Sequence, residues 1–247
     1  MPSDFFRIAV GRRLRVKFLQ EFATCPCCGA ALDAYMDHAL VCACRGDRTL
    51  RHNSARDSFF VEAREAGVRA EREKLGLLPL RPGDESLRGE RLSNGRRPAD
   101  VWFPGWSDNS PCAVDFAITS GLQVANLASA ASDPASIWGS YEEFKRRHLD
   151  TEERCLERGF IIRPFIIEAH GGGFGPVARR ICARVAKAAA ATSGEDVEVK
   201  AADLLRRISI SLHRENARAI LRRLPTQEGG SMAPSPAAWA EEAHAWQ

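Results

Sequence analysis

From Asn53 onward, apolar residues alternate between the spacing of helices and the spacing of strands. Apolar residues three or four positions apart predict helices at residues 53–67, 134–158, 176–193 and 201–224. Short apolar runs rich in Val, Ile, Phe and Trp predict strands at residues 68–73, 98–104, 111–119 and 160–168. The resulting order, α-β-β-β-α-β-α before the long last helix, indicates an α/β fold.

Turn and cap residues mark the ends of several of these elements. Asn53 can cap the first helix, and Asp133 followed by Pro134 is a good start for the second. Pro164 within the last strand indicates an edge or a bulge, because proline donates no hydrogen bond to a neighbouring strand. The glycine-rich stretch 170–176 predicts a tight turn between that strand and the next helix.

Two further segments flank the α/β domain, which is expected to cover residues 53–224. Residues 1–52 combine a basic amphipathic helix, within the first 22 residues, with a cysteine-rich stretch. Residues 225–247 are rich in Gly, Ser, Pro and Ala and are expected to be disordered. No run of roughly 18 apolar residues and no secretory leader pattern is present, so we expect a non-secreted protein without a membrane span.

The charge of the chain does little to single out a partner. A formal net charge of +3 over 247 residues is too small to indicate nucleic acid by itself. Of the 35 basic residues, 5 are Lys and the other 30 are Arg. Arginine favours bidentate contacts with phosphate, but a GC-rich genome produces the same bias, so both explanations stay open.

Five of the 8 cysteines fall within one short stretch, CPCCGAALDAYMDHALVCAC. Clustered cysteines in a non-secreted chain indicate a metal site more than disulfides. A Cys-x2-Cys pair followed by a His and a Cys has a suitable spacing for one tetrahedral, structural Zn²⁺. The additional thiols of Cys27 and Cys44 leave the ligand set open, and a group of reduced thiols is the alternative to a metal. The predicted zinc ligands are Cys25, Cys28, His38 and Cys42.

Each of the two central strands carries one carboxylate, Asp100 and Asp115. An ionised carboxylate in an apolar run is costly unless a cation meets it. Two carboxylates near the same end of neighbouring strands can hold a hard divalent cation, and phosphodiester hydrolysis uses such a cation to activate water. Lys145, in the following helix, could reach the same pocket and stabilise developing charge. The alternative is that the acids pair with structural arginines such as Arg96 or Arg97.

The segment Arg97-Pro98-Ala99-Asp100, with fourteen residues between it and Asp115, resembles the motif of the PD-(D/E)XK (restriction-endonuclease-like) superfamily. More narrowly, the cysteine-rich knuckle, Arg51-His52-Asn53 with Arg56-Asp57, and Arg-Pro-Ala-Asp come in the same order as in the endonuclease domain of site-specific non-LTR retrotransposon proteins. The stretches 164–172 and 212–218 also resemble the segments that lie after the core of such proteins. The resemblance covers residues 20–224 and depends on the order of its motifs.

This resemblance implies a restriction-endonuclease-like core, αβββαβ, with a mixed central sheet flanked by helices. Matched residue by residue, Asp100 and Asp115 become the ligands of a catalytic Mg²⁺ or Mn²⁺. The family's strand lysine is missing, because position 117 is Ala. In the retroelement branch a lysine from the following helix takes that role, and Lys145 fits this position.

The resemblance also implies a further catalytic acid, from Glu73, Glu62 or Asp57. Glu73 is preferred, because it ends the strand before the motif loop. Arg96 and Arg97, beside the motif, are expected to contact DNA.

The sequence therefore predicts a metal-dependent DNA endonuclease that nicks or cuts one strand. It resembles a detached retrotransposon endonuclease domain with an upstream zinc knuckle, and we expect it to be nuclear or otherwise intracellular, with DNA as its partner. The alternative is a catalytically decayed, zinc-containing nucleic-acid-binding protein. Ala117, at the position of the missing strand lysine, motivates this alternative.

Overall fold

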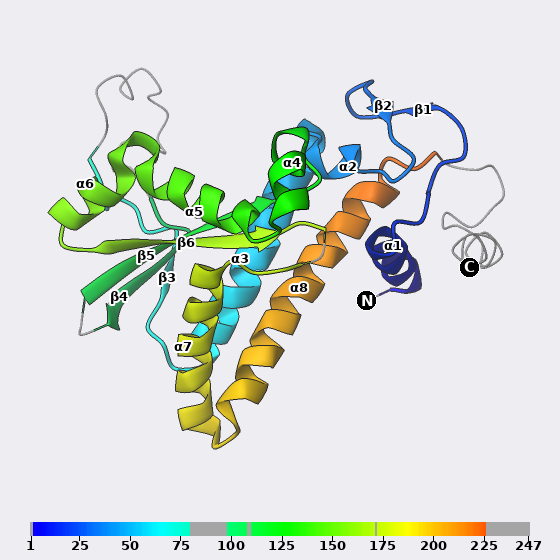
Figure 1. Ribbon diagram of the computed structural model, residues 1–247. Coiled ribbons are helices and arrows are strands. Elements are labelled where there is room, and N and C mark those ends of the chain that lie inside the picture. Colours follow the sequence, from blue (N-terminus) through cyan, green and yellow to red (C-terminus); the bar gives the residue numbers. More distant parts are fainter. Residues whose placement is uncertain (1, 80–97, 108–109, 171, 226–247) are drawn as a thin grey trace. The chain divides into compact units, whose positions relative to one another are not determined.

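A computed structural model describes residues 2–79, 98–107, 110–170 and 172–225 (Figure 1). As far as these ranges are described, the chain forms two compact units, one from Met1–Ala55 and Ser209–Gln247 and the other from Arg56–Ile208. The helices α3 (Asp47–Glu65) and α8 (Val197–Leu221) contribute to both. The end of α8 therefore groups with the N-terminal segment, an arrangement that no sequence pattern indicated.

The larger unit contains a four-stranded mixed sheet in the order β3-β4-β5-β6. Its strands are β3 (Glu71–Arg72), β4 (Val101–Ser107), β5 (Ser110–Thr119) and β6 (Ile161–Glu168). β3 pairs with β4, and β4 with β5, in antiparallel orientation, whereas β5 and β6 are parallel. A parallel pair needs a crossover connection, and the chain provides α4 (Val124–Ser132), α5 (Ser136–Arg147) and α6 (Thr151–Glu157). The predicted α/β class is confirmed.

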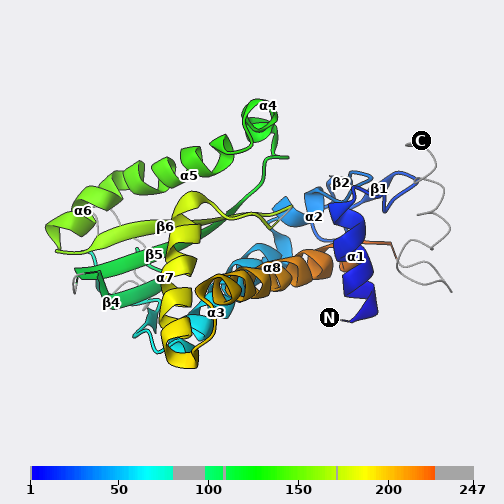
Figure 2. The same cartoon turned by 60° about the horizontal axis from the view of Figure 1, so that its bottom comes forward.

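Helices cover both faces of this sheet (Figure 2), with α5 and α6 on one face and α3 and α7 (Pro176–Ser193) on the other. Successive side chains of a strand point to opposite faces. Phe103 and Phe116 accordingly contact Phe59 of α3. Trp102, next to Phe103 on β4, and its pairing partner Ala113 on β5 pack with Cys155 of α6. The apolar alternation of the central strands therefore builds two cores, one on each face.

Phe59 is fully buried where α3 meets the sheet, with ring centroids 5.1 to 6.2 Å from three strand phenylalanines. We expect Phe59→Ala to lower the free energy of unfolding by about 3–5 kcal/mol, because it leaves a cavity among these rings. Val61, on the same helix, is 49% exposed, so Val61→Ala should change the free energy of unfolding by no more than about 0.5 kcal/mol. Urea denaturation measures both variants, and equal losses would contradict this packing.

The ends of several elements agree with their sequence signals. Gly194 takes a left-handed conformation (φ 75°) at the end of α7, as a helix-terminating glycine does. Pro164 lies in β6, which is an edge strand of the described sheet, as predicted. The stretch after β6 folds back on itself, with the Glu168 N–H donating to the carbonyl of Gly173 (2.7 Å). It is the predicted tight turn between a strand and a helix.

Three predicted helices differ from the structure. The basic helix predicted within the first 22 residues is α1 (Ser3–Arg13), whereas α8 begins four residues before the predicted residue 201. Asn53 lies inside α3 and does not cap it, since the helix begins at Asp47. The helix predicted over 134–158 is interrupted by a 3-10 turn in which Leu149 and Asp150 have φ angles of 58° and 56°. A right-handed helix cannot continue through two left-handed residues.

The smaller unit holds α1, a two-stranded hairpin, α2 (His38–Val41), the start of α3 and the end of α8. The hairpin strands are β1 (Ala23–Thr24) and β2 (Ala31–Leu32). Its core combines apolar residues of α1 and α8 with two buried thiols; the residues are Ile8, Cys25, Leu32, Met36, Ala39, Cys42, Ala217 and Ile220. The cysteine-rich stretch therefore takes part in the core of this unit.

None of the described helices is both long enough and apolar enough to cross a membrane. The predicted loop over 79–95 and the predicted disordered tail lie almost entirely outside the described residues.

Candidate metal centre and acidic site

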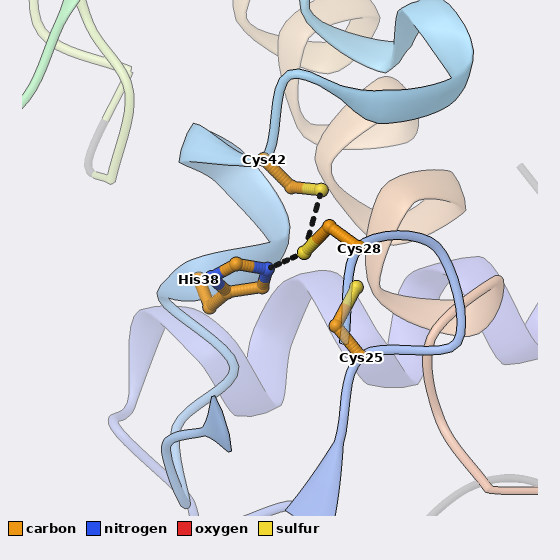
Figure 3. Close-up of side chains that lie close together, drawn as sticks. All are labelled: Cys25, Cys28, His38 and Cys42. Carbon is orange, nitrogen blue, oxygen red and sulfur yellow. Dashed lines mark hydrogen bonds between the residues drawn. The ribbon is translucent and has the colours of Figure 1, made fainter. Parts of the chain in front are cut away.

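The four predicted zinc ligands come together in the smaller unit (Figure 3), with their ligand atoms all within 4.8 Å of one another. The Sγ atoms of Cys28 and Cys42 are 3.7 Å apart, and the Sγ of Cys28 lies 3.2 Å from Nε2 of His38. Tetrahedral zinc with Zn–S bonds of about 2.3 Å places its sulfur ligands about 3.8 Å apart. The cluster can therefore hold a metal such as zinc. Cys27 and Cys44 are not members of it.

The β1–β2 hairpin shapes the first half of this cluster. The N–H of Cys25 donates to the carbonyl of Ala30 (2.8 Å), and the N–H of Gly29 donates back to the carbonyl of Cys25 (2.8 Å). Gly29 adopts a φ of 74°, which residues with a side chain rarely adopt. This tight turn directs Cys25 and Cys28 toward the same point.

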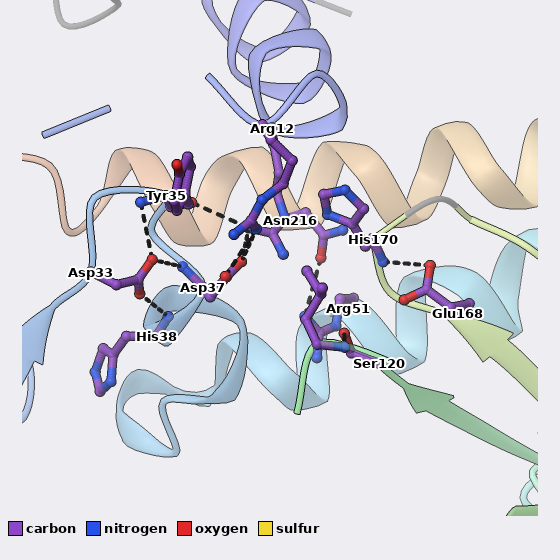
Figure 4. Close-up of polar contacts among 12 residues, drawn as sticks. Arg12, Asp33, Tyr35, Asp37, His38, Arg51, Ser120, Glu168, His170 and Asn216 are labelled. Atoms are coloured by element: carbon purple, nitrogen blue, oxygen red, sulfur yellow. Dashed lines mark hydrogen bonds and ion pairs between the residues drawn. The ribbon is translucent and has the colours of Figure 1, made fainter. Parts of the chain in front are cut away.

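Asp33 fixes the second half of the cluster (Figure 4). Its carboxylate accepts hydrogen bonds from the backbone N–H groups of Tyr35, Asp37 and His38, at 2.9 to 3.0 Å. Burial acts to raise the pKa of Asp33, but these N–H groups outweigh it and hold the pKa below its usual value. The chain entering α2 is thereby held in place, and His38 begins α2. Asp33 was not among the predicted site residues, although Asp often accepts a hydrogen bond from the backbone two residues on.

The thiols of the cluster influence one another's ionisation. Burial acts to raise the pKa of Cys25, but the N–H groups of Cys27 and Cys28 outweigh it and lower the pKa to about 7. The N–H of Ala30 acts to lower the pKa of Cys28, but desolvation and the neighbouring thiols raise it to about 11. Three adjacent thiols therefore do not all ionise readily on their own. A divalent cation between them would remove this conflict, because metal binding deprotonates its thiol ligands.

In the larger unit, three acids form a row: Glu73 directly follows β3, Asp100 directly precedes β4, and Asp115 lies in β5. The register pairs Val101 with Val114, and the N–H of Asp100 donates to the carbonyl of Val114 (2.9 Å), so Asp100 lies opposite Asp115. On the other side, the N–H of Glu73 donates to the carbonyl of Asp100 (2.9 Å). Residues directly opposite on neighbouring strands share a face of the sheet. Asp115 lies in β5 as predicted, whereas Asp100, predicted within a strand over 98–104, lies one residue before β4.

Lys145 of α5 reaches this row, as the sequence indicated. Its Nζ lies 2.9 Å from Oδ2 of Asp115, and the two side chains are 24% and 21% exposed. Burial acts to lower the pKa of Lys145, but the charge and hydrogen bond of Asp115, with smaller effects of Tyr141 and Asp100, leave it raised. Lys145 is therefore an ammonium ion at neutral pH. It can neutralise negative charge, but it is a poor proton acceptor in this state.

The backbone also contacts the other acid of the pair, because Oδ2 of Asp100 accepts the N–H of Phe116 (2.7 Å). Ala117 lies two residues beyond Asp115 on the same strand and is only 5% exposed. Residues two apart on a strand share a face. The helix α5 lies over one face of the sheet (Figure 2) and carries Lys145, which contacts Asp115.

The predicted additional acids are engaged by arginines. The Glu73 carboxylate accepts a hydrogen bond from Nη1 of Arg56, and Glu73 has a φ of 48°. Asp57 pairs with Arg56 and Arg72, at 2.9 and 3.1 Å. Glu62 pairs with Arg207 at 2.8 Å. Among the described residues, the Cys/His cluster is the one group of three or more ligands close enough to bind an ion, so the structure does not add Glu73 to a third ligand position.

The proposed DNA contacts Arg96 and Arg97 lie outside the described residues, so their placement relative to Asp100 stays a prediction.

Comparison with known proteins gives no match to a protein-family model, to a curated protein or to a solved structure. The residues and their geometry are therefore the basis for assigning a function.

Proposed function

We propose that the chain is a metal-dependent DNA endonuclease with a restriction-endonuclease-like core. The observation that carries this proposal is the juxtaposition of Asp100, Asp115 and Lys145: Asp100 directly before β4, Asp115 opposite it on β5, and a lysine 2.9 Å from Asp115. The order α3-β3-β4-β5, a helical crossover and a parallel β6 agrees with the core that the sequence resemblance implies.

The carboxylates of Asp100 and Asp115 would hold the divalent cation, since both offer oxygen ligands and are partly exposed. Mg²⁺ or Mn²⁺ bound there supplies a Lewis acid and lowers the pKa of a bound water. The residues of the chain themselves contribute charged groups and hold these groups in position. Asp100 is oriented by the N–H of Phe116, and the ammonium of Lys145 is placed to stabilise charge that develops on a phosphate oxygen.

Aromatic side chains beside this site support a nucleic-acid substrate. Phe144, next to Lys145, is 52% exposed, and its ring centroid lies 5.7 Å from Tyr141 and 4.9 Å from His148. Exposed rings next to a cation match what single bases need, because bases stack on aromatic side chains in many nucleic-acid-binding proteins. Tyr141 and Phe144 lie on α5, the helix that carries the lysine, and His148 directly follows it.

The test is nicking of supercoiled plasmid DNA by the purified protein. We expect conversion to the open-circular form in Mg²⁺ or Mn²⁺ and none in EDTA. EDTA can also remove zinc, so loss of activity in EDTA has two explanations. The decisive sample is protein that has kept its zinc, and its activity must return when Mg²⁺ is restored. A protein that leaves the plasmid intact in Mg²⁺ and in Mn²⁺ is not this endonuclease.

One observation favours a second function, a zinc-containing nucleic-acid-binding protein that has lost catalysis. Lys145 pairs with Asp115 directly, so a cation that uses this oxygen of Asp115 must displace the ammonium. With Ala117 at the strand position, no second lysine is available from β5. Binding to DNA that weakens as salt rises, without cleavage in any divalent ion, would identify this function.

A further inference from the structure

Arg223 lies directly beside the Cys/His cluster, and its side chain is fully buried. Its Nη1 donates to Oδ2 of Asp47 (2.7 Å) and to the carbonyl of Ala219 (2.8 Å), and its Nη2 donates to the carbonyl of Cys44 (3.2 Å). A buried guanidinium is costly unless charge and hydrogen bonds compensate it. These contacts fix where the guanidinium points.

The guanidinium also contacts a member of the cluster. A hydrogen bond joins the guanidinium to the thiol of Cys42. The Nη2 donor also holds the carbonyl of Cys44, two residues beyond Cys42, at 3.2 Å. The arginine thus faces the sulfur side of the cluster and not only Asp47.

The charges around the cluster are complementary to a loaded site. One divalent ion with three thiolates and a neutral histidine carries a formal charge of −1. Asp47 accepts hydrogen bonds from Arg222 at Oδ1 and from Arg223 at Oδ2, both at 2.7 Å. These three side chains together carry a charge of +1. Arg222 is 41% exposed, so water screens its charge, whereas Arg223 is fully buried and supplies the positive charge that faces the loaded site.

We propose that Arg223 is a positioning residue of this metal site, whose guanidinium compensates the charge of the three bound thiolates and orients Cys42 toward the ion. The site then favours divalent ions that accept thiolate ligands, such as Zn²⁺ or Co²⁺. Outer-shell partners of metal ligands typically contribute 10–100-fold to affinity. The inference does not depend on nuclease activity, because it concerns the metal affinity of the smaller unit alone.

The test compares Arg223→Met with Arg222→Met in the full chain. Arg222 contacts the other oxygen of Asp47 and is 41% exposed, so it is a matched control. Co²⁺ is titrated against a competing chelator, and its absorption bands report the ligands. We expect about 10–100-fold weaker Co²⁺ binding for Arg223→Met, with the three-sulfur, one-nitrogen spectrum retained, and a change below about threefold for Arg222→Met. Unchanged affinity in Arg223→Met, or an equal loss in both variants, would overturn the proposal.

Circular dichroism with saturating Co²⁺ shows whether the Met variant folds. If the Met variant does not fold, Arg223→Lys tests the proposal instead, because lysine keeps the positive charge of arginine and lacks its planar guanidinium group. The Co²⁺ affinity of the Lys variant should then stay within about tenfold of the parent value, the lower end of the effects that outer-shell partners have. A folded Lys variant with a larger loss overturns charge compensation as the role of Arg223.

Discussion

Asp115→Asn is expected to reduce Mg²⁺-dependent plasmid nicking on the order of 1000-fold. The substitution keeps the size of the side chain and removes the negative charge that would bind the cation. Metal catalysis contributes several kcal/mol to such reactions, and each 1.36 kcal/mol corresponds to about a tenfold change in rate. Initial rates of open-circle formation, measured by gel electrophoresis under single-turnover conditions, provide the comparison.

The matched control for this variant is Asp150→Asn. Asp150 is exposed and has a φ of 56°, a conformation that asparagine tolerates well. We expect the control to nick at the parent rate. A thermal melt of both variants separates loss of function from loss of fold. If folded Asp115→Asn nicks as fast as Asp150→Asn, the activity of the preparation has another source and Asp115 is not a metal ligand.

The sequence was sufficient to predict the members of the Cys/His cluster, because these residues lie close together in the chain. Cys25 and Cys28 lie within one turn, and the N-terminus of α2 presents His38 a short loop later. A spacing of a few residues restricts where each ligand atom can go, so counting residues predicts which ones meet. The surplus thiols of Cys27 and Cys44 left the ligand set open, and the geometry groups Cys25, Cys28, His38 and Cys42 without them.

The acidic site was predicted in part, for a different reason. Alternating strands fix the face on which Asp100 and Asp115 lie, and a crossover helix must return over the sheet, so Lys145 was a reasonable candidate. The break at Leu149 could not be seen in the apolar pattern, which runs on through it. Backbone conformation at such a point depends on tertiary packing, which overrides local propensity.

Residue spacing does not predict contacts between segments that are far apart in the chain. Arg223 and Asp47 are 176 positions apart in the chain, and their pairing depends on where α8 packs in the folded unit. Asp47 also begins α3, so its charge had a sufficient local explanation as a helix-start residue. The sequence therefore predicted the four residues of the Cys/His cluster and missed the buried arginine beside them.

Loss of the metal site is expected to unfold the smaller unit while the sheet of the larger unit stays folded. Two of the proposed ligands, Cys25 and Cys42, belong to the hydrophobic core of this unit. Structural zinc contributes about 10–16 kcal/mol to the folding of small zinc domains, which equals or exceeds the whole stability of a typical domain. The double variant Cys28→Ser, Cys42→Ser should bind no zinc, and its amides between residues 23 and 46 should exchange rapidly with deuterium.

Hydrogen exchange followed by mass spectrometry measures both units in one experiment. Peptides from β5 and β6 should keep their protection in the variant, since their hydrogen bonds lie within the larger unit. Cys27→Ser, Cys44→Ser is the matched control, because both thiols are partly buried beside the same core but lie outside the cluster. It should retain about one zinc per chain and the parent exchange pattern. Zinc retained by the Cys28, Cys42 variant, or lost from the control, would show that other side chains bind the ion.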